Sequence, residues 1–216
     1  MALKIDNVEI SWLGHSSSKI KTDKIIYIDP YNLQEAEKAD IILITHPHYD
    51  HCSIADLSKI AKDGSIVVCH AACQSTVTKL SQKINMQLMQ AGDELNLGNV
   101  KIKAVPAYNM KKQFHQKTEG WLGYLVSLNG IVIYHAGDTD LIPEMEKLTG
   151  FAKKGSKLIA LLPVDSAFAM SIDEAVKAAA MLKPFLAVPI HFKLEKDAEN
   201  FCKLCKDAGI RAEILK

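Results

Sequence analysis

The sequence has no long apolar run and almost no excess of charge of either sign. No apolar stretch approaches the roughly 18–20 residues that span a bilayer, so we expect no membrane span. The formal net charge is +1, which gives no reason to expect nucleic acid as a partner. The N-terminal segment lacks the long apolar core of a signal peptide, so the cytoplasm is the expected location.

Cysteine is also scarce, with five residues at positions Cys52, Cys69, Cys73, Cys202 and Cys205. An odd number without a secretory signal argues against a disulfide framework. Cys202 and Cys205 form a C-x-x-C pair, but no second pair follows that could complete a zinc site. We therefore expect this pair to be reduced structural thiols.

No linker, low-complexity tract or repeat interrupts the 216 residues, of which 48% are hydrophobic. This length can bury a substantial core and favours a single domain over residues 1–216. The apolar patterns predict strands at 8–13, 24–28, 39–44, 65–69, 101–106, 120–128, 131–135, 157–162, 185–190 and 211–214. They predict helices at 54–61, 73–83, 171–182 and 195–208, and a loop at 14–18.

Two local signals support this pattern. Asn129-Gly130 predicts a hairpin between two of the strands, and Ser171 with Glu174 forms a capping box for the third helix. Strands and helices at both ends, with hairpins between them, favour two sheets packed together and covered by helices, which is an α/β fold.

Four side chains that commonly bind metals lie directly after a predicted buried strand: His46, His48, Asp50 and His51. Imidazoles suit zinc and carboxylates suit harder ions, so the mixture favours Zn²⁺, with Mn²⁺ or Fe²⁺ as alternatives. A loop can point alternate side chains at neighbouring points, so one segment could serve two metal ions. A polar surface loop with chance histidines is the alternative.

The segment 45–51 resembles the H-x-H-x-D-H signature of the metallo-β-lactamase superfamily. Residues 134–139 resemble its Gly-Asp-Thr segment, and residues 188–191 resemble the strand that ends in its last histidine. Residues 12–15 and 28–30 resemble the opening strands of the branch of this superfamily that contains ascorbate-phosphate lactonase-like proteins. The resemblance implies a metallo-β-lactamase fold, an α/β four-layer αββα sandwich, and says little about the substrate.

The same resemblance implies two metal ions and a ligand set. It assigns His46 and His48 to the first metal, Asp50, His51 and His191 to the second, and Asp138 to the bridge between them. The residues support this assignment independently, because each is a good ligand and follows a predicted strand, where loops gather at one edge of a sheet.

The sequence departs from the family at the third ligand of the first metal. The family has a histidine soon after the strand that corresponds to 101–106, whereas here the next histidine is His115. Either His115 reaches back to the metal, or Asn109, water or nothing completes the site. We predict His115, with Phe114 burying against the domain to anchor the loop and Gly120 and Gly123 giving it freedom to fold back.

Other polar residues have two readings each. His15 lies in a predicted loop that should open towards the same edge of the sheet as the metal ligands. There it either contacts substrate or a metal ligand, or only supports the loop. His135 is a candidate for buried support of the bridging aspartate, and Asp29 for accepting a hydrogen bond from a ligand imidazole. His70 is expected to be structural. Lys111, Lys112 and Lys117 would attract an anionic substrate if their loop closes over the site, and are otherwise solvated lysines.

The implied chemistry is hydrolysis of an ester-like bond, a lactone or a phosphodiester, in a small anionic molecule. A hydroxide bridging the metals would attack, and Asp50 would orient it and move a proton. No protein nucleophile is needed, and no Gly-x-Ser-x-Gly elbow occurs. A non-catalytic metal-dependent binding protein is one rival. A redox diiron protein is another, although it should have a carboxylate in place of His48 and an attached electron-transfer domain.

Overall fold

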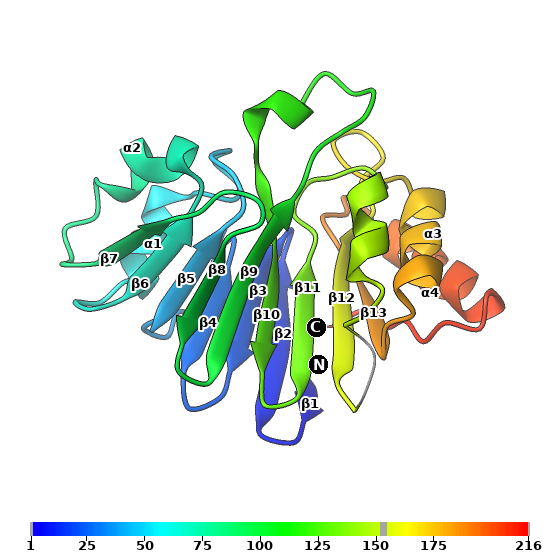
Figure 1. Ribbon diagram of the computed structural model, residues 1–216, viewed down its shortest axis with the longest axis horizontal. Coiled ribbons are helices and arrows are strands. Elements are labelled where there is room, and N and C mark those ends of the chain that lie inside the picture. Colours follow the sequence, from blue (N-terminus) through cyan, green and yellow to red (C-terminus); the bar gives the residue numbers. More distant parts are fainter. Residues whose placement is uncertain (1, 152–154, 216) are drawn as a thin grey trace. The chain divides into compact units, whose positions relative to one another are not determined.

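The computed structural model describes residues 2–151 and 155–215 (Figure 1). The chain comprises two compact units: unit 1 spans Met1–Met89 with Leu215–Lys216, and unit 2 spans Gln90–Ile214. Each unit has its own sheet with helices packed against it. A single domain over the whole chain stays a prediction.

Unit 1 is built on a sheet whose strands are ordered as in the chain, β1-β2-β3-β4-β5-β6-β7. They are β1 Leu3–Ile5, β2 Val8–Gly14, β3 Ser17–Lys21, β4 Ile25–Ile28, β5 Ile41–Ile44, β6 Ile66–Cys69 and β7 Asn85–Leu88. Pairing is antiparallel from β1 to β4 and parallel from β4 to β7. Helix α1 (Ile54–Ile60) and the short α2 (Gln74–Val77) share a buried apolar cluster with this sheet.

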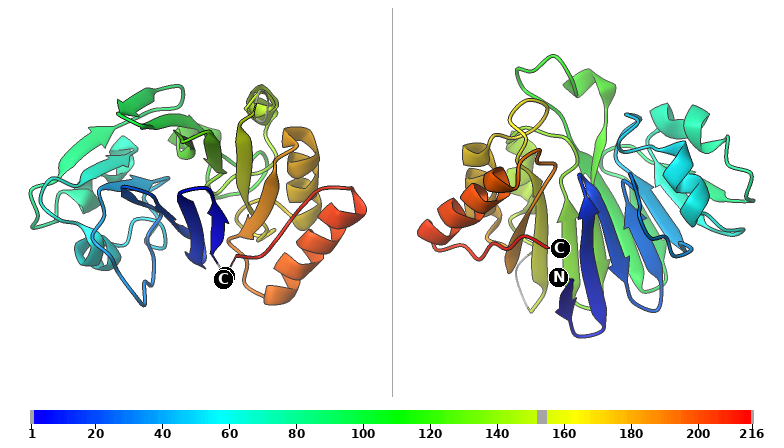
Figure 2. Two further views of the ribbon diagram at one scale, coloured as in Figure 1. Left: turned by 90° about the horizontal axis from the view of Figure 1, so that it is seen from below. Right: turned by 180° about the vertical axis from the view of Figure 1, so that it is seen from behind.

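Unit 2 has a sheet with the strand order β13-β12-β11-β10-β9-β8. Its strands are β8 Glu94–Leu97, β9 Val100–Pro106, β10 Leu122–Leu128, β11 Ile131–His135, β12 Lys157–Pro163 and β13 Leu186–Ile190. Pairing is antiparallel from β8 to β11 and parallel from β11 to β13. Helices α3 (Ile172–Leu182) and α4 (Glu195–Asp207) lie beside β12 and β13 (Figure 2).

Both local signals are confirmed. Asn129 and Gly130 have φ angles of 47° and 74°, as a two-residue hairpin turn of the mirror-image type requires, and they join β10 to β11. Ser171 caps α3 by accepting a hydrogen bond from the Glu174 backbone N–H, and the Glu174 carboxylate accepts one from the Ser171 backbone N–H.

The carboxyl ends of parallel strands place the predicted site residues. In unit 1, Asp29 follows β4 and the segment 45–51 follows β5, which is parallel to β4. In unit 2, Asp138 follows β11 and His191 follows β13, and both strands run parallel to β12. Within each unit, these side chains therefore gather at one edge of the sheet.

Three predicted elements are wrong. The loop at 14–18 contains the start of β3, and its serines are buried. The helix at 73–83 ends at Val77, where Thr76, Val77 and Thr78 crowd a helical backbone and the Thr78 hydroxyl donates to the Gln74 carbonyl. The strand at 211–214 is a single bridge, in which Ala212 faces Ala187. Strands β1, β7 and β8 were not predicted, because runs of three or four residues that mix apolar and polar side chains give no clear pattern.

All five cysteines are free in the described part of the chain. Burial raises the pKa of the Cys202 thiol to about 11 and that of the Cys205 thiol to about 12. Both are therefore protonated and weakly nucleophilic at neutral pH, as expected of structural thiols. No helix within the described ranges combines the length and apolar character needed to cross a bilayer.

Asp56 ties helix α1 to the loop after β4. Its buried carboxylate accepts hydrogen bonds from the backbone N–H groups of Asn32 (2.9 Å) and Leu33 (3.0 Å), from the Ser53 hydroxyl (2.7 Å) and from Lys59 Nζ (2.9 Å). Burial alone would raise the pKa of Asp56, but these partners outweigh it and hold the pKa below its ordinary value of 3.8. The ionised form therefore stabilises the fold.

We expect Asp56→Asn to lower the free energy of unfolding at pH 7 by about 1–3 kcal/mol, because buried N–H groups lose a charged acceptor. Because the folded pKa of Asp56 is depressed, its contribution is present above the unfolded pKa and is lost as the pH falls through the folded pKa, below pH 3.8. Urea unfolding at pH 7 and at stepwise lower pH measures both effects. An equal loss of stability in the variant at pH 7 and well below pH 3 would contradict this account.

Candidate metal centre

In unit 1, Asp29 holds the segment that follows β5. Its Oδ1 accepts a hydrogen bond from the Thr45 backbone N–H at 2.8 Å, and its Oδ2 accepts from the Thr45 hydroxyl at 2.6 Å and from His51 Nδ1 at 2.8 Å. A carboxylate can only accept, so the proton of His51 is on Nδ1 and the lone pair is on Nε2. This is the tautomer that a metal ligand needs.

The same reasoning fixes His46. The Thr45 hydroxyl gives its hydrogen to Asp29, so at 3.0 Å from His46 Nδ1 it acts as the acceptor of that ring's N–H. The lone pair of His46 is therefore on Nε2, which lies 3.1 Å from His48 Nδ1. Two nitrogens bound to one tetrahedral zinc at about 2.0–2.1 Å lie roughly 3.3 Å apart, so this spacing suits two ligands of one ion.

His15 and Asp50 contact each other in unit 1. His15 Nε2 lies 3.1 Å from Asp50 Oδ2, and the Trp12 indole N–H donates to the His15 carbonyl at 2.7 Å. Burial would raise the pKa of Asp50, but the hydrogen bond from His15 and the nearby His51 lower it to about 2. Asp50 is therefore ionised at neutral pH, and His15 contacts a residue predicted to bind metal.

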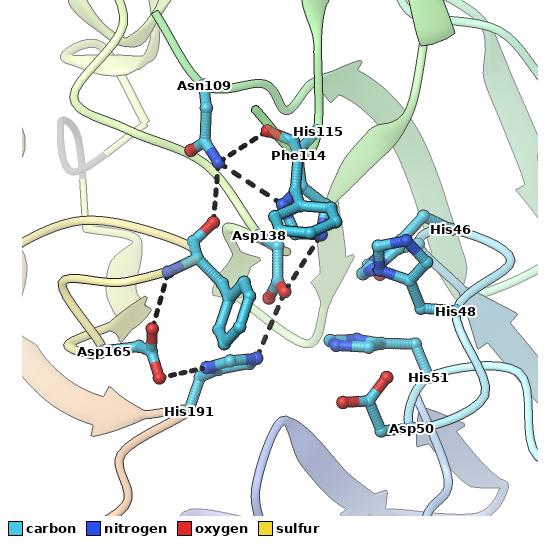
Figure 3. A network of polar contacts seen from close by, with 12 residues as sticks. His46, His48, Asp50, His51, Asn109, Phe114, His115, Asp138, Asp165 and His191 are labelled. Atoms are coloured by element: carbon cyan, nitrogen blue, oxygen red, sulfur yellow. Dashed lines mark hydrogen bonds and ion pairs between the residues drawn. The ribbon is translucent and has the colours of Figure 1, made fainter. Parts of the chain in front are cut away.

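In unit 2, two imidazoles face one carboxylate oxygen (Figure 3). His115 Nε2 lies 3.3 Å and His191 Nε2 lies 3.1 Å from Asp138 Oδ2, and all three side chains are buried. Each of these two separations suits an imidazole and a carboxylate that bind the same cation. His135 is buried at the end of β11, and its Nδ1 accepts from the Gly137 backbone N–H at 3.3 Å, within the turn that leads to Asp138.

The loop that contains His115 is held mainly by Asn109. The Asn109 backbone N–H donates to the His115 carbonyl at 2.6 Å, and its side-chain Nδ2 donates to the carbonyls of Phe114 at 2.9 Å and Phe168 at 2.6 Å. Asn109 Nδ2 also lies 3.3 Å from His115 Nδ1. The side-chain amide hydrogens of Asn109 are therefore used to hold the loop with His115 and to join it to the Phe168 carbonyl.

The expected burial of Phe114 and the expected freedom of Gly123 are wrong, whereas Gly120 does have a conformation typical of glycine. Phe114 is 47% exposed and touches Phe168 rather than burying in the core. Gly120 has a left-handed φ of 67° and ends a 3₁₀ helix, but Gly123 has no such conformation. A Cβ on Gly123 would come within 2.7 Å of the Ala136 carbonyl oxygen, so Gly123 permits close packing rather than movement.

Most of the charge near this loop is paired. Lys112 forms an ion pair with Asp140, and Lys117 contacts Glu144 at 2.9 Å and the Tyr108 hydroxyl at 3.0 Å. Lys111 is exposed. His70 is the N-cap of a 3₁₀ helix (Ala71–Cys73), where its Nδ1 accepts from the Ala72 backbone N–H, which favours the structural reading.

Sequence reasoning did not single out Asp165. It follows β12, and its side chain is only 1% exposed. Burial would raise its pKa, but His191 and the Phe168 backbone N–H outweigh burial and lower it. A polar residue just after a buried parallel strand is the signal that also marks Asp138 and His191, and it was available for Asp165.

The profile of the Beta-lactamase superfamily domain matches residues 9–191, which is most of the chain. The chain therefore belongs to this family, and the prediction of a metallo-β-lactamase superfamily member is confirmed. The narrower resemblance to ascorbate-phosphate lactonase-like proteins stays a prediction.

Full-length relatives agree. A UPF0173 metal-dependent hydrolase of Thermococcus onnurineus is 35% identical and covers 96% of this chain and 95% of its own length. A crystal structure from Parabacteroides distasonis, of a protein provisionally assigned as a metal-dependent hydrolase, has a TM-score of 0.85 at 30% identity, over 100% of this chain and 97% of that one. The metallo-beta-lactamase fold protein YhfI of Bacillus subtilis has a TM-score of 0.73 at 16% identity, over 98% and 97%.

These likenesses confirm the predicted α/β metallo-β-lactamase fold. They also confirm the predicted enzyme class, so the chain is a metal-dependent hydrolase of this superfamily. The buried histidines and carboxylates of each unit are chemically suited to hold a metal ion.

Proposed function

We propose that the chain hydrolyses an ester-like bond, a lactone or a phosphodiester, in a small anionic molecule, using two divalent metal ions. Zinc is the first choice, and Mn²⁺ or Fe²⁺ are the alternatives. The proposed ligands are His46, His48 and His115 for the first ion, Asp50, His51 and His191 for the second, and Asp138 for both. This assignment follows the family pattern position by position except at His115, which is proposed in place of the family's histidine after the strand predicted at 101–106.

The hydrogen bonds of Asp29 support the proposal most strongly. This one carboxylate sets the tautomer of His51 directly and that of His46 through the Thr45 hydroxyl. In both imidazoles the lone pair is then on Nε2. A histidine that only filled a core would have no need of this arrangement, whereas a ligand imidazole commonly donates its other N–H to a carboxylate or another hydrogen-bonded group.

The residues of the chain then divide the work of hydrolysis. When bound, the metal ions would supply an ionised water as nucleophile and a Lewis acid for the developing negative charge. Asp50, ionised at neutral pH and in contact with His15, can orient the attacking water through a carboxylate oxygen and accept its proton there. That proton can then pass to the leaving oxygen.

Three finer parts of the proposal have their own support. The anionic substrate rests on Lys111, which is exposed in the loop with His115, whereas Lys112 and Lys117 are paired. The absence of nucleic acid as a partner rests on the small net charge. The cytoplasm fits the free thiols of the described cysteines, because such thiols persist in a reducing compartment.

Metal loading and turnover can be tested together. We expect protein that is stripped with a chelator and reloaded with Zn²⁺ or Mn²⁺ to hold more than about one equivalent of metal by elemental analysis. It should cleave bis(p-nitrophenyl) phosphate or a lactone bearing a carboxylate, and cleave a neutral lactone less well. The stripped protein should be inactive, because no protein nucleophile is proposed.

The outcomes separate the functions. Less than about half an equivalent of bound metal would contradict the two-metal proposal. Two equivalents without turnover of any of these substrates would favour a metal-dependent binding protein. Equal turnover of charged and neutral lactones would contradict the anionic substrate alone.

A further inference from the structure

Asp165 lies in unit 2, in the turn between β12 and α3, and uses its two carboxylate oxygens differently. Oδ1 accepts hydrogen bonds from the backbone N–H groups of Ala167 at 2.9 Å and Phe168 at 2.6 Å, which folds the turn back on itself. Oδ2 is buried and has no hydrogen bond to any described residue. It lies 3.7 Å from His191 Nδ1 and 4.0 Å from Lys193 Nζ.

The imidazole of His191 therefore lies between two carboxylates. Its Nδ1 faces Asp165 Oδ2, and its Nε2 lies 3.1 Å from Asp138 Oδ2 (Figure 3). A neutral imidazole has one proton for its two nitrogens. If that proton is on Nδ1, facing Asp165, the lone pair of Nε2 is available to a metal next to Asp138. If the proton is on Nε2, His191 cannot be a ligand through that nitrogen.

Asp165 Oδ1 is linked to the second imidazole, that of His115, through the turn that it folds. The turn that it folds presents the Phe168 carbonyl, which accepts from Asn109 Nδ2 at 2.6 Å. The same amide nitrogen donates to the Phe114 carbonyl at 2.9 Å, next to His115 in the chain. A connected path of hydrogen bonds thus runs from Asp165 to the loop that places His115 Nε2 at 3.3 Å from Asp138.

We propose that Asp165 is a positioning residue of the metal centre, which orients both imidazoles that face Asp138. Through Oδ2, which lies 3.7 Å from His191 Nδ1, it selects the His191 tautomer that binds metal through Nε2. Through Oδ1 it holds the turn that anchors Asn109 and the His115 loop. The inference rests on the proposed function only in taking His191 and His115 as ligands.

Asp165→Asn tests the tautomer contact alone. Asparagine keeps an oxygen for the backbone N–H groups of the turn, but its NH₂ group cannot accept a hydrogen from His191 Nδ1. We expect the variant to bind Zn²⁺ about 10- to 100-fold more weakly in a chelator competition, and to change the visible absorption of the Co²⁺-loaded protein. Neither readout needs a substrate.

Two further variants make the test specific. Asp173→Asn removes a similar charge at an exposed position in the first turn of α3 and should leave both readouts unchanged. In a His191→Ala background, Asp165→Asn should cause no additional loss of Zn²⁺ affinity, because its effect acts through His191. Circular dichroism shows whether each variant is folded. Asn is close to Asp in size and keeps an oxygen for the turn, so we expect Asp165→Asn to fold.

Zn²⁺ affinity within about two-fold of the unmodified protein, with the same Co²⁺ spectrum, would overturn the proposal, and so would an undiminished loss in the His191→Ala background. These outcomes differ from a failure of the proposed function. That failure would appear as an unmodified protein that binds no metal or hydrolyses nothing, whatever Asp165 does.

Discussion

Asp138→Asn should lower hydrolysis by at least about 1,000-fold and weaken the binding of both metal ions. Loss of a hydrogen-bond partner behind a ligand already costs about 10- to 100-fold, and here a proposed shared ligand loses its charge. Asp138 Oδ2 is the atom that both His115 Nε2 and His191 Nε2 face, at 3.3 Å and 3.1 Å. An amide oxygen belongs to a neutral group, so it bridges two cations poorly.

The measurement is metal content and turnover of the reloaded variant, and Asp56→Asn is the matched control. Both residues are buried aspartates, but the hydrogen-bond partners of the Asp56 carboxylate are Asn32, Leu33, Ser53 and Lys59, none of which is a predicted ligand. The control should unfold more easily and still bind metal. Asp138→Asn should bind little metal while the metal-free fold is no less stable. Activity of Asp138→Asn within a few-fold of the unmodified protein would mean that Asp138 is misassigned.

His115→Asn should release one of the two proposed metal ions. Asparagine tolerates the left-handed backbone of this position, where φ is 59°, so the substitution tests the imidazole with little added strain. Removing one of the four proposed protein ligands should weaken binding of the first metal by more than about 100-fold, because the loss of a hydrogen-bond partner behind a ligand already reaches that size. At a metal concentration that just saturates the unmodified protein, the content should fall from about two equivalents to about one, and hydrolysis should fall with it.

Calorimetric titration with Zn²⁺ measures the two sites separately. His70→Asn is the control, because His70 caps a 3₁₀ helix and asparagine is also a good cap. It should keep two binding events. If His115→Asn also keeps two events with unchanged affinities, His115 is not a ligand, and a metal-dependent binding protein or a site with one metal gains support.

The strands that position the site could be predicted because their residues are apolar in nearly continuous runs. Strands β5, β11, β12 and β13 are buried on both faces, and their ends could be predicted to within two residues. Strand β3 was missed because buried serines look like a loop in sequence. The helix predicted from Cys73 was too long, because its apolar spacing outweighed the β-branched residues that end it at Val77.

The ligands could be predicted from their type and spacing, and so could Asp29 as a hydrogen-bond partner of a ligand imidazole. The contacts of Thr45 and Asp165 with the ligand imidazoles could not. Nothing in the order of the chain shows that Thr45 relays a hydrogen bond from His46 to Asp29. Asp165 looked like an ordinary turn residue before Ser166, and the two backbone N–H groups on its Oδ1 fit that reading. Its contact with His191 depends on the parallel pairing of β12 with β13, which no local sequence pattern predicts.

Four of the proposed site residues have a left-handed backbone, with φ of 51° at His15, 47° at Asp29, 59° at His115 and 53° at His191. For a residue with a Cβ, this conformation costs roughly 1–2 kcal/mol, which glycine avoids. At these positions, the residue that would most stabilise the fold is therefore not the residue that the metal site requires. A screen that rewards heat tolerance alone would favour glycine there and discard the imidazoles and the carboxylate. Engineering of a hardier enzyme should hold these four codons fixed and seek its gains in the outer turns and helix ends.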